Sequence, residues 1–459
     1  MELDEWVEQQ VRASARFMER SISATSLHIR REHFQQVVVP TQGSVLASPE
    51  IAAWDPNPDY FFHWVRDSAI VMNAVVLLGQ EEGAHWYRHV DDFIAFSMTL
   101  TEIDGTSFRH HDSAPDYARF LRPADEVKSL DTDALLGEPR FNPDGTADIF
   151  RWSRPQYDGP ALRALTCLTY RQVTDPSQRS TIDRLVMTDL DFTAAHADQP
   201  CIGLWEEENE IGHHYHTALV QLGALYHGRR WAARRGDSSR AETYEYAARR
   251  LRAGLGGHWS AENRCYQAIR NQRSKQPGDG LDASALLGVL DARLPDAEHS
   301  VLDAKVHSTV VQIEDLFDAR FPINHNRPVG HGPALGRSRG DRYFGGGAWY
   351  PTTLALAEFY YRLGSAMRRP GMLPETPLNQ AFRDRVFGTA TDRERQVRAC
   401  IDKGDCVMAT VRRFTPLDGA LSEQLDQTTG EQRSARHLSW SYAAFVTAAH
   451  ARRQALGRC

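Results

Sequence analysis

Residues 201–226 read CIGLWEEENEIGHHYHTALVQLGALY. Four carboxylates fall within five positions, directly after a Leu-Trp pair. The apolar residues behind them recur at spacings of three and four, which predicts a helix: Ile211, Tyr215, Ala218, Leu219, Leu222, Leu225 and Tyr226. We therefore expect the acids in a loop that enters a helix N-terminus, where the helix dipole tolerates negative charge. Acidic clusters are more often solvated first turns, but Leu204 and Trp205 offer the apolar setting that favours a general acid.

The same arrangement of a distinctive loop before an apolar helix recurs along the chain. The predicted loops are 58–68, 152–158, 204–210, 336–347 and 421–436. Each precedes a segment that is apolar nearly all round, as in a buried helix. The segments 4–22, 83–100, 178–195 and 238–253 are instead charged and amphipathic.

Alternating buried and amphipathic helices indicate two concentric helix layers, with the buried helices inside. The five loops would then lie at one end and face a single pocket. The run Gly345-Gly346-Gly347 lacks the preceding strand of a nucleotide-binding fingerprint. Because no linker-like segment divides the chain, residues 1–459 are expected to form one domain.

The composition excludes several classes of protein. Lys plus Arg number 53 against 60 Asp plus Glu, a net charge of −7, which disfavours binding to nucleic acid. The six cysteines are scattered, a pattern that suits a reduced compartment. Residues 1–10 carry no secretory apolar run, and no stretch approaches the roughly 20 apolar residues of a membrane span. We expect a soluble cytoplasmic protein without nucleic-acid or membrane partners.

The loop at 58–68 combines Tyr60, Phe61, Phe62 and Trp64 with an Arg66-Asp67 pair. Aromatic rings stack on sugar or base faces, and Arg and Asp hydrogen-bond to hydroxyl groups. An aromatic core with a structural ion pair explains the same residues about equally well.

His213, His214 and His216 raise the question of a metal, since His213 and His216 are expected to share a helical face. No carboxylate or cysteine completes a recognisable ligand set. We expect neither a metal nor a cofactor.

Six ordered blocks resemble glucoamylases, members of the family-15 glycoside hydrolases, over nearly the whole chain. The blocks are Asp59-Tyr60-Phe61 with Trp64 and Arg66-Asp67-Ser68; Gly137-Glu138-Pro139-Arg140-Phe141-Asn142; Arg154-Pro155-Gln156 with Asp158-Gly159-Pro160-Ala161; Leu204-Trp205-Glu206-Glu207; Gly336-Arg337; and Ser422-Glu423-Gln424 with Ser434-Ala435-Arg436 and Trp440-Ser441-Tyr442-Ala443. The resemblance implies an all-α fold, an (α/α)6 barrel, in agreement with the two predicted layers.

The resemblance also implies roles. Glu206 matches the general acid and Glu423 the general base. The substrate-binding candidates are Arg66, Asp67 and Arg337 for the terminal glucose hydroxyls, Tyr60 and Trp152 around that sugar, Trp205 and Glu207 toward the leaving group, and Trp64, Leu204 and Trp440.

Inverting glycosidases need two carboxyls roughly 6.5–9.5 Å apart, with a water between them. We expect Leu204 and Trp205 to give the acid apolar surroundings, and Ser422 and Gln424 to give the base polar ones.

These features predict an exo-acting, anomer-inverting α-glucoside hydrolase that releases β-D-glucose from short α-glucans, with α-1,4 linkages preferred. The alternatives are an α-1,6-specific isomaltase or glucodextranase, a trehalase, and a non-catalytic carbohydrate-binding or regulatory barrel. Both catalytic carboxyls are present, which favours an enzyme over the last of these. The sequence leaves linkage, chain length, natural substrate and oligomeric state open.

Overall fold

The computed structural model describes residues 2–52, 57–104, 115–208, 210–271, 279–295, 298–369 and 373–458. Six helices form an inner ring: α2 (Val65–Glu82), α6 (Asp158–Tyr170), α8 (Tyr215–Arg234), α10 (Ser284–Ala292), α13 (Tyr350–Ala366) and α16 (Ser439–Ala455). Each packs against the next, and α16 packs back against α2 to close the ring. The all-α fold and the (α/α)6 barrel are confirmed.

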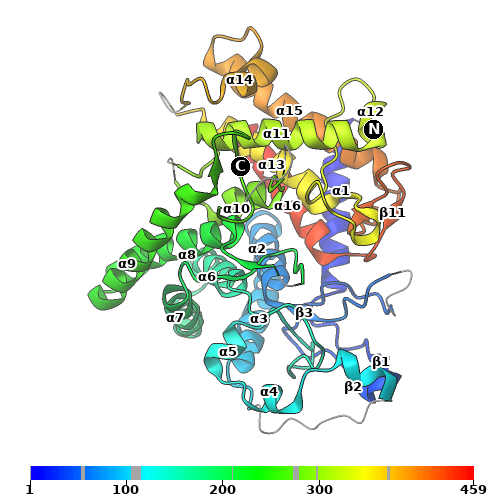
Figure 1. Cartoon of the computed structure of the whole chain (residues 1–459), viewed down its shortest axis with the longest axis vertical. Helices are drawn as coiled ribbons and strands as arrows, with labels where there is room; N and C mark the ends of the chain where they lie inside the picture. Colours follow the sequence, from blue (N-terminus) through cyan, green and yellow to red (C-terminus); the bar gives the residue numbers. More distant parts are fainter. Residues whose placement is uncertain are drawn as a thin grey trace.

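Six further helices form the outer layer: α1 (Leu3–Glu19), α3 (Tyr87–Leu100), α7 (Arg179–Ala195), α9 (Ser238–Leu255), α11 (Ala304–Arg320) and α15 (Arg393–Phe414). In Figure 1 the inner helices lie toward the centre of the molecule, and the outer helices surround them. The layers are joined by side-chain contacts as well as by apolar packing. Arg163 of α6, for example, donates to Asp189 of α7 at 2.9 and 2.7 Å.

Short helices, 3-10 turns and short strands lie in the loops that connect the barrel helices. The remaining helices are α4 (Ala124–Lys128), α5 (Thr132–Leu136), α12 (Pro322–His325) and α14 (Gln380–Phe387), with 3-10 turns at η1 (Glu32–Phe34), η2 (Ala84–Trp86), η4 (Pro115–Phe120), η5 (Pro176–Gln178), η6 (Gly256–His258) and η7 (Tyr343–Gly345). The paired strands are β1 (Ile29–Arg31) with β2 (Gln36–Val38), β3 (His63–Trp64) with β4 (Arg140–Phe141), β5 (Cys201–Ile202) with β6 (Ile211–Gly212), and β7 (Trp259–Ser260) with β8 (Cys265–Tyr266). A three-stranded sheet has the order β11 (Gln432–Arg433), β10 (Gln424–Leu425), β9 (Ala348–Trp349).

These strands hold the loops at the N-terminal ends of the inner helices. Strand β3 runs directly into α2, and β9 runs directly into α13. Strand β10 pairs with both β9 and β11, and so holds residue 423 beside the start of α13. In the part of the chain that the structure describes, no helix is long and apolar enough to cross a membrane.

The close approach of α8 to α10 gives a stability prediction. A Cβ on Gly223 would lie 2.1 Å from the Ala292 carbonyl oxygen. Overpacking costs about 1–3 kcal/mol, more than the roughly 1 kcal/mol that alanine gains in helix propensity. We expect Gly223→Ala to lower the free energy of unfolding by up to about 2 kcal/mol in urea titrations, the overpacking cost less the gain in helix propensity. A Cβ on Gly256 meets nothing within 4 Å, so Gly256→Ala is the matched control, and equal stability of the two variants would contradict this account.

Candidate active site

One cavity of about 800 Å³ opens at the N-terminal ends of the inner helices. All twelve residues singled out in the sequence line it: Tyr60, Trp64, Arg66, Asp67, Trp152, Leu204, Trp205, Glu206, Glu207, Arg337, Glu423 and Trp440. Residues from loops far apart in the sequence therefore meet in one place, as the layered arrangement predicts.

Glu206 lies at the tip of the loop that strands β5 and β6 close. The acids lie in a loop ahead of a helix, as predicted, but the prediction that Ile211 belongs to that helix is wrong, because Ile211 is in β6 and α8 begins at Tyr215. Glu206 has a φ of 60°, a left-handed conformation that costs a non-glycine residue about 1–2 kcal/mol. The Ser153 hydroxyl donates to the Glu206 carbonyl at 2.9 Å, and the Glu206 amide donates to Gly203. These contacts hold the strained residue in place.

The carboxyl of Glu206 is surrounded by N–H donors. Its Oε1 accepts from Trp64 Nε1 at 2.9 Å, Gln156 Nε2 at 2.8 Å and Arg66 at 3.2 Å. Its Oε2 accepts from Trp152 Nε1 at 2.6 Å. The expectation of apolar surroundings from Leu204 and Trp205 is wrong, since donors from two other loops hold this group.

Glu423 is the more deeply buried carboxyl, with 2% of its surface exposed. Burial raises its pKa to about 7, although hydrogen bonds from Ser434 and Tyr60 and the charge of Arg337 oppose the shift. Tyr60 donates to Oε1 at 3.2 Å, and the Ser434 hydroxyl donates to Oε2.

The residues expected to give Glu423 polar surroundings do not contact its side chain in the described structure. The Ser422 hydroxyl donates to the Gln424 carbonyl, and Gln424 Oε1 accepts from the Gly347 amide. Ser434, 11 residues farther along the chain, takes that place because β11 pairs with β10. The prediction for Ser422 and Gln424 is therefore wrong.

Arg66 and Asp67 are both buried, and they form an ion pair with 3.4 Å between Nε and Oδ2. Neither of these two atoms has a hydrogen-bond partner within the residues that the structure describes. Burial raises the pKa of Asp67 to about 6, while Arg66 lowers it and Glu206 raises it. A buried polar pair with unused hydrogen-bonding capacity beside a cavity is well suited to binding hydroxyl groups.

Arg337 also lines the cavity and belongs to the loop before α13. Its Nε donates to Asp341 at 2.9 Å, and its guanidinium lies 3.2 Å from Glu207. The same guanidinium lies 5.5 Å from the Trp205 ring centre. Trp205 and Trp440 stack with 6.2 Å between ring centres. Charge and aromatic surface thus alternate on this part of the cavity wall, as in sites that bind sugars.

A sixth loop, before α10, was not predicted from the sequence. Its Asp282 accepts from Trp205 Nε1 at 2.8 and 3.1 Å and so fixes that indole. The apolar run at 283–290 after an aspartate was the available signal. Asp341, Tyr343 and Trp349 also line the cavity, and no role was predicted for them. Gln156 belongs to one of the six sequence blocks, and its bond to Glu206 was not predicted.

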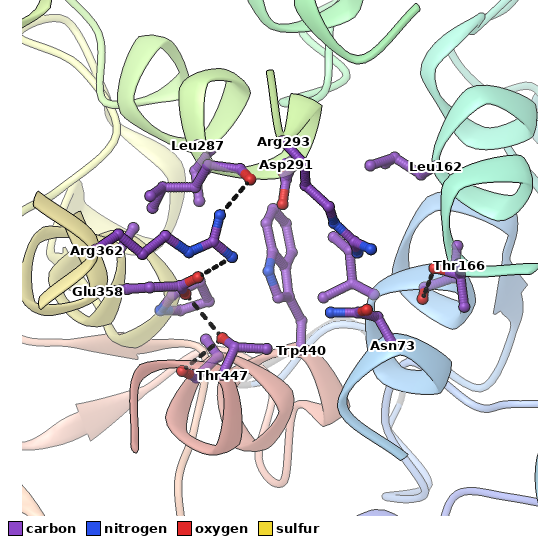
Figure 2. A pocket seen from close by; sticks show the side chains of 16 residues that line it. Asn73, Leu162, Thr166, Leu287, Asp291, Arg293, Glu358, Arg362, Trp440 and Thr447 are labelled. Carbon is purple, nitrogen blue, oxygen red and sulfur yellow. Dashed lines mark hydrogen bonds and ion pairs between the residues drawn. The ribbon is translucent and has the colours of Figure 1, made fainter. Parts of the chain in front are cut away.

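Two smaller cavities border this one. A cavity of about 620 Å³ shares Leu204, Trp205, Glu206 and Glu207 with it. A cavity of about 40 Å³ lies inside the ring and shares only Trp440. Figure 2 looks into the latter, with Trp440 at its centre, Arg362 and Glu358 on one side, and Arg293 and Asn73 on the other.

His213, His214 and His216 each have different partners. His213 precedes α8, so the expected shared helical face with His216 is wrong; its Nδ1 lies 3.5 Å from Asp198. His214 Nε2 contacts the Glu210 carbonyl, and His216 is buried between two aspartates. Among the described residues, no group of three or more His, Cys, Asp or Glu side chains could hold a metal ion.

Comparisons with known proteins agree on one family. The family model "Glycosyl hydrolases family 15" matches residues 27–450. The chain is 29% identical to Glucoamylase 1 of Rhizopus oryzae over 86% of its length and spans 65% of that protein. It is 30% identical to Glucoamylase-1 of Schizophyllum commune, covering 89% of the chain and 69% of that relative. A solved family 15 glucoamylase from Hypocrea jecorina superposes with a TM-score of 0.81 at 25% identity, covering 100% of this chain and 73% of the other.

Proposed function

The chain belongs to glycosyl hydrolases family 15, and from that premise we propose that it is an exo-acting, inverting α-glucosidase. Its substrates are short α-glucans, cleaved at non-reducing ends, with α-1,4 linkages preferred. The observation that carries the proposal is that Glu206 and Glu423 line one cavity together with Arg66 and Asp67.

The chemistry follows from the positions of the donors. Arg66 and Asp67 bind hydroxyls of the terminal glucose. Glu206 Oε1 accepts three N–H donors and Oε2 one, so Oε2 carries the proton passed to the leaving oxygen. Glu423 removes a proton from a water that attacks the anomeric carbon from the opposite face. The glycosidic bond breaks, Glu206 ends ionised and Glu423 ends protonated.

The stereochemistry of the product tests the proposal. Water attack opposite the leaving group converts an α-linkage into β-D-glucose. We expect ¹H NMR of a fresh maltotriose digest to show the β-anomer before mutarotation. Initial α-glucose would mean a retaining mechanism, and early oligosaccharides from a long glucan would mean an endo-acting cleft. Rates on maltose, isomaltose, panose and trehalose give the linkage preference.

The raised pKa of Glu423 predicts a pH dependence. The base must be ionised, so kcat/KM should fall as pH decreases through about 7, by tenfold per unit below the pKa of the free enzyme. The Ser434 hydroxyl bond lowers this pKa, so Ser434→Ala should move the fall to higher pH. The measurement is kcat/KM on maltose between pH 4 and 9.

Ser422→Ala is the matched control, because its hydroxyl donates to the Gln424 carbonyl. We expect the pH midpoint of this variant to remain that of the wild type. An equal displacement by both substitutions, or none by either, would refute the assignment of Ser434.

A further inference from the structure

Four charged or titratable groups form a row that leads away from Glu206. Arg66 lies 3.2 Å from Glu206 and 3.3 Å from Asp158. His216 Nδ1 lies 3.8 Å from Asp158, and its Nε2 lies 3.3 Å from Asp291. The four groups come from α2, α6, α8 and α10, which are consecutive helices of the inner ring. The row therefore runs around the ring behind the wall of the cavity.

Burial makes the middle of this row sensitive to its partners. Asp158 and His216 are each 1% exposed. Asp158 Oδ2 accepts a hydrogen bond from Arg66, whereas its Oδ1 and His216 Nδ1 have no hydrogen-bond partner in the described ranges. A buried carboxylate is costly unless neighbouring charges and donors compensate it. Arg66 donates to Asp158 on one side, and on the other side the His216 ring lies between Asp158 and Asp291.

We propose that His216 is a positioning residue for the catalytic acid: it holds Asp158 from behind, and Asp158 in turn fixes Arg66 against Glu206. The inference rests on the proposed function, since it assigns a role relative to Glu206 as acid. Asp291 orients the ring from the far side. His216 also borders the 620 Å³ cavity, but its burial leaves the imidazole no surface for substrate.

Two substrates with different leaving groups distinguish a role of His216 in positioning the acid from a role in the stability of the fold. Fluoride leaves without strong proton donation, whereas the sugar alkoxide released from maltose requires it. We expect His216→Leu to lower kcat on maltose by up to about 100-fold, the scale of a misplaced catalytic group, with much less loss on α-D-glucosyl fluoride. His216→Gln keeps an N–H donor and should recover part of the maltose activity. KM should change little in either variant.

His307→Gln is the matched control, since His307 is equally buried, belongs to the outer helix α11 and contacts the Val301 carbonyl. It should lower the melting temperature and leave the ratio of the two rates unchanged. Should His216→Leu fail to fold, Asp291→Asn replaces it and should change the same ratio in the same direction. Equal losses on both substrates, or no loss on either, would overturn the positioning role. Wild-type protein that hydrolyses neither substrate would overturn the proposed function and this inference with it.

Discussion

Glu206→Gln is expected to lower kcat on maltose by about 10²–10⁴-fold, the usual contribution of a general acid. Glutamine retains the size of the side chain, and its single carbonyl oxygen can accept from Trp64 and Arg66 in place of Oε1, while the bond from Trp152 to Oε2 is lost. The backbone bonds of residue 206 to Ser153 and Gly203 should keep the conformation of the loop. The rate on α-D-glucosyl fluoride should fall far less, because fluoride needs little protonation. Initial rates on both substrates, with circular dichroism to monitor folding, measure the effect.

Glu242→Gln is the matched control for this variant, since Glu242 is an exposed carboxyl on the outer helix α9 and does not line the cavity. Its substitution should leave both rates near those of the wild type. If Glu206→Gln hydrolysed maltose at a near-normal rate, Glu206 would be only part of a solvated acidic cluster.

Glu423→Gln should lower kcat on both maltose and α-D-glucosyl fluoride by at least about 10²–10⁴-fold, because water activation is needed whatever the leaving group. The two catalytic variants therefore differ in their dependence on the leaving group.

In Glu423→Ala, azide can occupy the space of the missing carboxyl and attack the anomeric carbon without a base. We expect azide to restore turnover with β-glucosyl azide as product, and no such rescue in Glu206→Gln.

The stability of Glu423→Gln gives an independent check. Burial raises the pKa of Glu423 to about 7 in the folded protein from 4.5, so the folded state holds this proton more tightly than the unfolded state. The contribution of Glu423 to the free energy of unfolding is therefore fully present below pH 4.5 and is lost as pH rises to about 7. Glu423→Gln should therefore melt at the same or a higher temperature than the wild type at pH 8. A large fall in melting temperature at that pH would indicate a structural role.

The two carboxyls lie in contrasting environments, and the contrast is opposite to that expected from their sequence neighbours. Four side-chain donors from β3, from α2 and from the segment at 152–156 surround Glu206, whereas burial dominates at Glu423. The proposed inverting mechanism needs an acid and a base on opposite sides of the sugar ring, and the different sets of donors around the two carboxyls agree with it.

The sequence alone predicted the helical layers and the residues that line the cavity. Apolar periodicity identified α2, α6, α8, α13 and α16 because an inner helix must be apolar on every side. The shorter apolar segment of α10 was missed, and Asp282 with it. The resemblance of the six sequence blocks implied the twelve candidates, and all twelve line the cavity.

Only the tertiary structure decided which partner each carboxyl has. Trp205 follows Leu204 in sequence, yet its indole bonds Asp282 of another loop, and Glu206 accepts from Trp64, Trp152 and Gln156. Ser434 replaces Ser422 beside Glu423 because strand pairing brings residues 11 apart into contact. Hydrogen bonds and buried charges depend on distances of a few ångströms between segments that only the closed ring brings together. Local sequence does not determine those distances. The electrostatic environment of both carboxyls and the row of charged groups from Arg66 to Asp291 therefore exist only in the folded barrel.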